Sequence, residues 1–124
     1  MIYLDTHIVV WLFAGQVEKL SSKAKDLLNK NEIQISPIVR LELQYLKDIK
    51  RITVSPDEII TELSNLIGLK ICSKSFNSII SRSMNLVWTW DPFDRVIVAN
   101  AALNDDYLVT GDQIILQNYR KSLN

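Results

Sequence analysis

The chain has 124 residues, a length typical of one compact domain, and its mixture of apolar and charged residues is that of a folded protein. Its 14 basic and 14 acidic residues give a formal charge of zero, so no overall basic field points to a nucleic acid. One cysteine and one histidine exclude an internal disulfide and an ordinary zinc site with four nitrogen or sulfur ligands.

No apolar run approaches the roughly 18 residues that a bilayer crossing needs, and the opening MIYLDTH lacks the segments of a secretion signal. We therefore expect a cytoplasmic protein without membrane contact. No repeat, low-complexity tract or flexible linker divides the chain, so residues 1–124 are predicted to form a single domain.

The chain begins with an apolar run at residues 1–4 that favours a β-strand. Asp5 and Thr6 then lead into residues 7–15, a segment of helix length that ends at Gly15. Ser21 or Ser22 is a suitable cap for a second helix, which we expect to continue to about residue 29.

A second strand is predicted at residues 33–35. Ser36 and Pro37 then form a cap followed by proline at the first helical position, which predicts a helix to about residue 50. Ser55 and Pro56 repeat this opening for a helix that ends near Gly68.

A third strand is expected at residues 69–72, followed by a helix that Ser75 opens and that runs to about residue 85. Asp91 and Pro92 begin another helix, which ends near residue 104. The last clear strand covers residues 107–110, and Gly111 breaks it before a short amphipathic tail.

Strands that alternate with helices predict an α/β fold, in which a central, mainly parallel sheet lies between layers of helices. In such sheets ligands bind at the carboxyl ends of the strands. Asp5 directly follows the first predicted strand, and Asp112 lies two residues after the last. We therefore expect both carboxylates to point into one crevice.

Two further acids lie on predicted helices among apolar neighbours. Glu42 falls in a stripe with Ile38, Tyr45 and Ile49, and Asp94 shares its helix face with Ile97, Val98 and Ala101. Burying an ionised carboxylate costs several kcal/mol unless it is compensated, and a divalent cation compensates it. Mg²⁺ and Mn²⁺ prefer oxygen ligands, so Asp5, Glu42, Asp94 and Asp112 are predicted to form a metal site.

Each acid also has a structural interpretation. Asp5 suits a helix cap and Asp112 a turn after Gly111. Glu42 has a possible ion-pair partner in Arg40 or a lysine, and Asp94 favours the positive end of its helix together with Asp91. Four separate structural explanations are less probable together than one shared site.

The order and spacing of these motifs resemble the PIN-domain nucleases, and in particular the VapC-like toxins. The matching segments are LDTHIVVWL, SPIVRLELQYL, WDPFDRVIVANA and LVTGD, and WDPFDRVIVANA is the most specific of them. The resemblance places the family's four acids at Asp5, Glu42, Asp94 and Asp112, and a supporting hydroxyl at Thr110. Asp91 is an additional carboxylate.

The resemblance implies a three-layer α/β/α fold and a Mg²⁺- or Mn²⁺-dependent endoribonuclease. It also implies a homodimer that is neutralised by a cognate VapB-like antitoxin, whose C-terminal segment occupies the active-site groove. With one metal ion or two, a metal-activated water would cleave RNA to leave a 5′-phosphate and a 3′-hydroxyl. No histidine or lysine base is required.

Residues around the acids are candidates for orienting the acids and for binding RNA, and most of them also have a purely structural interpretation. Thr6 and Thr110 are expected to orient Asp5 and Asp112, or else to act only as caps. The candidates for contact with substrate phosphates are Arg40 and Arg95, followed by Lys47 and Arg82. His7 is expected to pack or hydrogen-bond at the first helix. The aromatic residues that suit either base stacking or core and dimer contacts are Trp11, Phe13, Trp88 and Trp90.

Three other functions compete with a ribonuclease. A phosphatase of the haloacid-dehalogenase type needs a second acid two positions after the first, where this chain has His7. A DNA nuclease shares the acidic cluster but normally has a larger chain. A PIN-fold binding module without catalysis has no need to keep four mutually repelling carboxylates together.

Overall fold

The computed structural model describes all 124 residues and contains one five-stranded sheet. The strands are β1 (Ile2–Leu4), β2 (Ile33–Ile35), β3 (Lys70–Ile71), β4 (Tyr107–Val109) and β5 (Ser122–Leu123). All strand pairs are parallel, and the order β3-β2-β1-β4-β5 places β1 in the centre. The predicted α/β class with a parallel sheet is confirmed.

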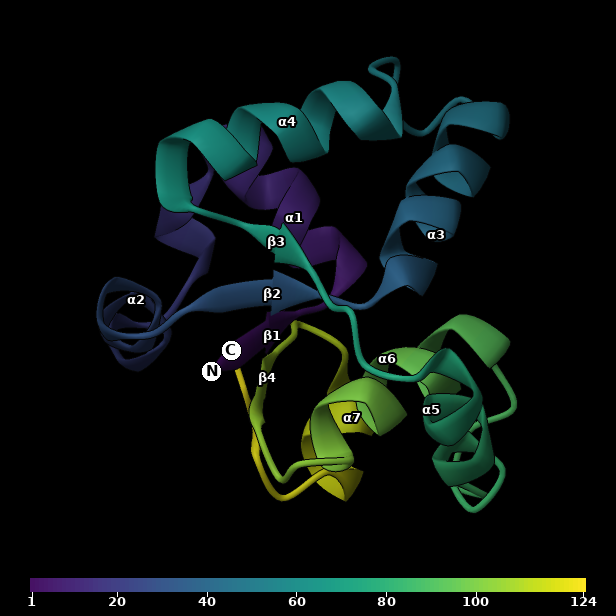
Figure 1. Ribbon diagram of the computed structural model, residues 1–124. Coiled ribbons are helices and arrows are strands. Elements are labelled where there is room, and N and C mark those ends of the chain that lie inside the picture. Colours follow the sequence, from purple (N-terminus) through teal and green to yellow (C-terminus); the bar gives the residue numbers. More distant parts are fainter.

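Helices cover the sheet. They are α1 (Thr6–Phe13), the 3₁₀ helix η1 (Val17–Lys19), α2 (Ser22–Lys30), α3 (Pro37–Asp48), α4 (Pro56–Ile67), α5 (Phe76–Ser83), α6 (Pro92–Ala102) and α7 (Gln113–Asn118). Figure 1 shows α1, α3 and α4 above the sheet and α5, α6 and α7 below it. None of these helices combines the length and the apolar character that a bilayer crossing requires.

The predicted helix starts are confirmed by their caps. The side chains of Ser36, Ser55 and Asp91 each accept hydrogen bonds from backbone N–H groups in the first turn of α3, α4 and α6. The end of α4 is also as predicted, because Gly68 adopts a left-handed conformation with φ of 71° that favours glycine.

The prediction of a short amphipathic tail after Asp112 is incomplete. The tail contains α7 and the edge strand β5, which pairs with β4. Backbone hydrogen bonds of 2.9 Å run from Leu108 N to the carbonyl of Lys121 and from Thr110 N to that of Leu123. These long-range bonds form β5, although its two residues carry no strand pattern of their own.

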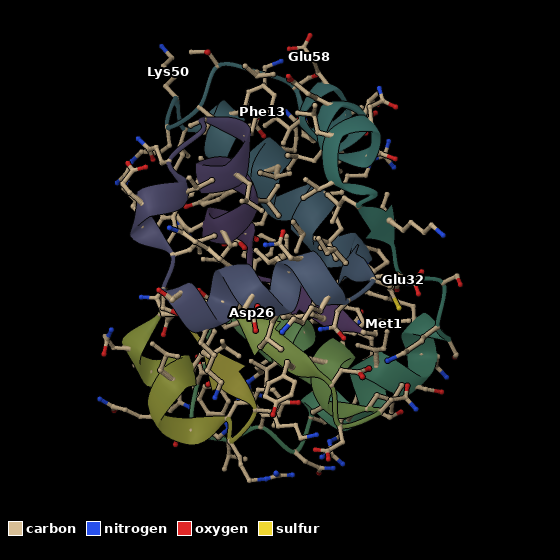
Figure 2. The ribbon with its side chains drawn as sticks, turned by 90° about the vertical axis from the view of Figure 1, so that its left-hand side faces the viewer. Met1, Phe13, Asp26, Glu32, Lys50 and Glu58 are labelled. Atoms are coloured by element: carbon tan, nitrogen blue, oxygen red, sulfur yellow. The ribbon has the colours of Figure 1, made fainter.

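The core lies on both faces of the sheet, so all three residues of β1 are buried. Leu4 packs in one cluster with Ile8 of α1, Ile35 of β2 and Leu43 of α3. Charged side chains lie outside this cluster, and Figure 2 shows Glu32, Lys50 and Glu58 at the outer edge of the molecule.

The predicted apolar stripe on α3 is wrong in part. The buried face consists of Val39, Leu43 and Leu46, whereas Tyr45 and Ile49 are exposed. Glu42 is half-buried and lies at the boundary of these two faces. The stripe was misplaced because exposed apolar residues on α3 follow a helical spacing similar to that of the buried ones.

The register of β1 and β4 positions the first site residue. Leu4 pairs with Val109, and the N–H of Asp5 donates to the carbonyl of Val109 over 2.9 Å. Asp5 and Thr110 therefore lie side by side at the carboxyl edge of the two central strands, where α/β folds bind ligands.

Candidate active site

Asp5 is a buried carboxylate held by two donors. Its Oδ1 accepts the N–H of Thr6 at 2.7 Å, and its Oδ2 accepts the hydroxyl of Thr110 at 2.6 Å. Burial raises the pKa of Asp5, and these hydrogen bonds offset only part of that rise. Asp5 is thus both the cap of α1 and a desolvated carboxylate at the strand end.

Glu42 of α3 is held from the start of α1. The hydroxyl of Thr6 donates a hydrogen bond to its Oε1. Burial raises the pKa of Glu42, and the negative charge of Asp5 raises it further. No ion pair joins Glu42 to Arg40 or to a lysine, so the structural alternative for this residue does not apply.

Asp91 and Asp94 project from the first turn of α6. Asp91 caps the helix, because its Oδ1 accepts the N–H groups of Phe93 and Asp94 at 2.8 and 3.1 Å. The carboxylate of Asp94 has no hydrogen-bond or ion-pair partner. Burial raises the pKa of Asp94 to about 7, with further contributions from the negative charges of Asp91, Asp5, Asp112 and Glu42.

Asp112 caps α7 at the other side of the site. Its Oδ1 accepts the N–H groups of Ile114 and Ile115 at 2.9 and 3.1 Å. The N–H of Asp112 donates to the hydroxyl of Thr110 over 3.0 Å. Thr110 therefore joins Asp112 to Asp5.

The predicted acids line one cavity of about 250 Å³. Its walls are formed by Asp5, His7, Trp11, Glu42, Asp91, Asp94, Gly111 and Asp112. The structure thus brings together all four predicted acids and the additional Asp91. No three of these side chains lie close enough to form a ready-made cation cage.

The donor set fits a hard divalent cation. Five carboxylates surround the cavity, no lysine or arginine lines it, and the carboxylate of Asp94 is unpaired. Carboxylate oxygens are the ligands that Mg²⁺ and Mn²⁺ prefer. A cation would offset both the burial and the repulsion between carboxylates that raise the pKa of Asp94.

The contacts of Thr110 agree with its predicted position beside Asp5 and Asp112, whereas the Thr6 hydroxyl has a partner that was not predicted. The hydroxyl of Thr6 contacts Glu42, and only its backbone N–H contacts Asp5. The hydroxyl of Thr110 serves Asp5 as a donor and Asp112 as an acceptor. Each hydroxyl therefore reaches an acid from a distant part of the chain, a relationship that depends on strand and helix placement.

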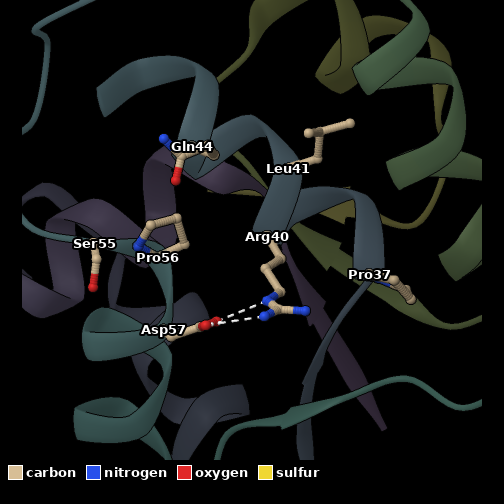
Figure 3. A pocket seen from close by; sticks show the side chains of 7 residues that line it. All are labelled: Pro37, Arg40, Leu41, Gln44, Ser55, Pro56 and Asp57. Atoms are coloured by element: carbon tan, nitrogen blue, oxygen red, sulfur yellow. Dashed lines mark hydrogen bonds and ion pairs between the residues drawn. The ribbon is translucent and has the colours of Figure 1, made fainter. Parts of the chain in front are cut away.

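The predicted phosphate contacts lie outside the cavity. Arg40 donates from Nε and Nη2 to Asp57 over 2.7 and 2.9 Å, in a separate depression of about 400 Å³ between α3 and α4 (Figure 3). Arg40 and Glu42 are two positions apart, so a helix directs them to different faces. Arg95 donates from Nε to the carbonyl of Thr89 over 2.6 Å.

Besides the five acids, the cavity wall contains His7, Trp11 and Gly111. The sequence offered Trp11 for either base stacking or core contacts and gave His7 and Gly111 no site role. His7 is exposed at the cavity instead of packed at the first helix, so that expectation is wrong. Trp11 follows His7 by four positions, which places both on one face of α1. The four-residue spacing of His7 and Trp11, directly after Asp5, could have predicted from the sequence that both face the site. Gly111 approaches Trp11 so closely that a side chain there would meet the indole ring.

Comparison with known proteins agrees with this geometry. The family model described as PIN domain matches residues 2–121, so the chain belongs to the PIN-domain family, whose members are nucleases that generally use divalent metal ions. The phosphatase alternative is thereby excluded. A search of curated proteins finds no match.

Two solved structures share the fold over the whole chain. One is a protein of a toxin–antitoxin complex from Klebsiella pneumoniae, with 22% identity and a TM-score of 0.69 over 100% of this chain and 97% of that one. The other is VapBC2 from Rickettsia felis, bound to a DNA fragment from its promoter, with 20% identity, a TM-score of 0.67 and 100% coverage of both chains.

Proposed function

We propose that this protein is a Mg²⁺- or Mn²⁺-dependent endoribonuclease and the toxin of a toxin–antitoxin pair. The observation that supports it best is the unpaired carboxylate of Asp94 inside a cavity lined by Asp5, Glu42, Asp91 and Asp112. Four acids kept together in one cavity, with the pKa values of Asp5, Glu42 and Asp94 raised, are expected in a metal-dependent nuclease and have no use in a binding module.

Asp5, Glu42, Asp94 and Asp112 would hold the metal, which supplies an activated water and polarises the phosphoryl oxygen. Thr110 fixes Asp5 and Asp112 relative to each other, and Thr6 fixes Glu42. Asp91 holds the first turn of α6 and thereby the position of Asp94. Hydrolysis by water leaves a 5′-phosphate and a 3′-hydroxyl, without a cyclic intermediate.

The distribution of charge suits an anionic substrate. Gathering four acids at the site leaves 14 basic against 10 acidic residues on the rest of the molecule. The basic residues without an ion-pair partner would hold phosphates around the acidic centre, whereas Lys30, Arg40, Lys70, Lys74, Arg120 and Lys121 are paired with acids. Arg95 lies one position from Asp94 and remains the arginine best placed for this contact, whereas Arg40 is occupied by Asp57.

The toxin role and the partners are proposed from likeness to the two solved complexes. A VapB-like antitoxin would neutralise the enzyme by covering the acidic cavity. A homodimer would bury the exposed apolar residues of α3, which are Leu41, Tyr45 and Ile49. The simplest genetic observation is a small neighbouring reading frame whose product copurifies with this chain and blocks its activity.

The enzymatic proposal is tested with labelled RNA and DNA of the same sequence, in Mg²⁺, in Mn²⁺ and in excess chelator. We expect RNA cleavage with either metal and none with chelator. Asp94→Asn and Asp5→Asn should each lose at least about 100-fold in rate. Asp57→Asn is the matched control, because it neutralises an exposed aspartate outside the cavity and should leave cleavage unchanged.

The other outcomes identify the competing functions. A 2′,3′-cyclic phosphate product, or full activity in chelator, would overturn the metal mechanism. Cleavage of DNA alone would replace the ribonuclease by a DNA nuclease. Absence of cleavage under every condition, together with tight binding of a protein partner, would favour the catalytically silent binding module.

A further inference from the structure

We propose that Trp11 forms a nucleobase subsite beside the acidic centre, where one base of single-stranded RNA stacks on the indole next to the phosphate to be cleaved. The inference rests on the proposed ribonuclease function and names a residue that binds a base of the substrate. Trp11 is the one hydrophobic residue among the eight that line the cavity.

The chemistry of the cavity requires a contact of this kind. Its walls carry five carboxylates and no lysine or arginine, so the cavity itself repels a polyanion. Binding energy next to the scissile phosphate must then come from the metal and from an uncharged contact. Stacking of a base on an aromatic ring supplies such a contact and tolerates different bases, because every base has a π-face.

The indole is held in place before any substrate arrives. Trp11 packs against the main core through α1 and lies against Gly111 of the β4–α7 connection. A Cβ atom at Gly111 would lie 2.9 Å from Cη2 of Trp11, so the absence of a side chain there is what admits the ring. A preorganised ring loses little conformational entropy when a base stacks on it.

The positively charged side chain of Lys19 lies over the indole ring of Trp11. Nζ of Lys19 lies 5.2 Å from the centre of the Trp11 ring, and Lys19 is exposed and has no ion-pair partner. Because Nζ lies over the ring, a base that stacks on this face would displace the ammonium group, which would then be free to contact a flanking phosphate. Trp11 and Lys19 together match the base and the phosphate of one nucleotide.

The small size of the cavity leaves no room for several nucleotides side by side. Its volume of about 250 Å³ is below the roughly 300–1,000 Å³ of typical small-molecule pockets. Trp90 is a contrasting case, because it is 89% exposed and does not line the cavity. The structure therefore distinguishes two tryptophans near the acids, of which only Trp11 belongs to the site wall.

The test compares a short RNA oligomer with an abasic ribose-phosphate oligomer of the same length and charge. Binding is measured with Mg²⁺ in an Asp94→Asn background, which prevents cleavage. We expect the base-bearing oligomer to bind about 5- to 150-fold more tightly than the abasic one, the range typical of one stacked base. Trp11→Leu should bring this ratio close to one, and Trp11→Phe should retain most of it.

Trp90→Leu is the matched control and should leave the ratio unchanged. A protein with Trp88→Phe and Trp90→Phe keeps Trp11 as its only tryptophan, and its fluorescence should be quenched by the base-bearing oligomer but not by the abasic one. This readout also decides the question if Trp11→Leu fails to fold. An unchanged ratio in Trp11→Leu, a lost ratio in Trp90→Leu, or an absence of quenching would each overturn the subsite.

The two proposals fail in different ways. Metal-dependent RNA cleavage without a preference for the base-bearing oligomer would overturn only the Trp11 subsite. A preference that depends on Trp11, without cleavage of RNA under any condition, would overturn the nuclease and leave a base-binding site.

Discussion

The hydroxyl of Thr110 donates a 2.6 Å hydrogen bond to the carboxylate of Asp5, although the two residues are 105 positions apart in the chain. The bond joins the carboxyl ends of β4 and β1, the two central strands that pair in parallel. Because the same hydroxyl accepts the N–H of Asp112, one side chain fixes two of the proposed metal ligands. Residues that orient ligands in this way are commonly as important as the ligands.

Thr110→Val should separate this positioning role from simple packing. Valine has nearly the same shape but no hydroxyl, so we expect the rate of RNA cleavage to fall about 10- to 100-fold. The hydrogen bond from Thr110 lowers the pKa of Asp5, so its loss should also move the acidic limb of the pH–rate profile to higher pH. Thr110→Ser should restore both properties, and an unchanged profile in the valine variant would contradict the assignment.

The raised pKa of Asp94 predicts how stability depends on pH. This pKa is 3.8 in the unfolded chain and about 7 in the folded protein, so the folded protein binds more protons between these values. With chelator present, the free energy of unfolding should therefore fall as the pH rises through this interval. Asp5 and Glu42, whose pKa values are also raised, contribute in the same direction.

Urea unfolding at about pH 5 and about pH 8, with chelator and with Mg²⁺, measures this dependence. Mg²⁺ should stabilise the protein more at the higher pH, where the carboxylates are ionised. Asp94→Asn should be less sensitive to pH in chelator than the natural protein. Stability that rises between the two pH values in chelator would show that burial and neighbouring charges do not raise the pKa values of these acids.

Gly111→Ala tests the contact between Gly111 and Trp11. The new methyl group would lie 2.9 Å from Cη2 of the indole, which forces the ring to move. Crowding of this kind typically costs about 1–3 kcal/mol, so the thermal midpoint should decrease. In a Trp11→Phe background the smaller ring leaves room, and the same substitution should cost much less. Equal losses in both backgrounds would show that the two residues are independent.

Leu43→Ala provides a test of the core that leaves the acids in place. Leu43 is fully buried on α3, beside Glu42 in the sequence, and packs in the main cluster. Its truncation should lower the free energy of unfolding by about 2–5 kcal/mol, measured by denaturant titration. Leu41→Ala, on the exposed side of the same helix, should be close to neutral in the monomer.

The sequence predicts the elements of this fold well where local chemistry decides them. Ser36, Ser55 and Asp91 each precede a proline, and this pair of residues both caps a helix and fixes its first turn. Strand β1 is recognisable because all of its residues are apolar, as burial on both faces requires. The parallel arrangement then follows from the alternation of strands and helices, and it places Asp5 and Asp112 at one edge.

The remaining features depend on contacts between distant segments. Ser122 and Leu123 are a strand only because β4 offers an unpaired edge, so no local pattern reveals them. The partner of Thr6 is Glu42, which depends on how α3 packs beside α1. The pairing of Arg40 with Asp57 likewise depends on how α4 packs against α3. The sequence did show that Arg40 and Glu42 lie on different faces of α3, because they are two positions apart.

The central position of β1 has a consequence for synthesis of the protein. The first strand made needs the fourth as a neighbour, and Asp5 needs Thr110, so the acidic cavity is completed only when nearly the whole chain has left the ribosome. For the proposed nuclease, a nascent chain that lacks β4 is therefore expected to be inactive.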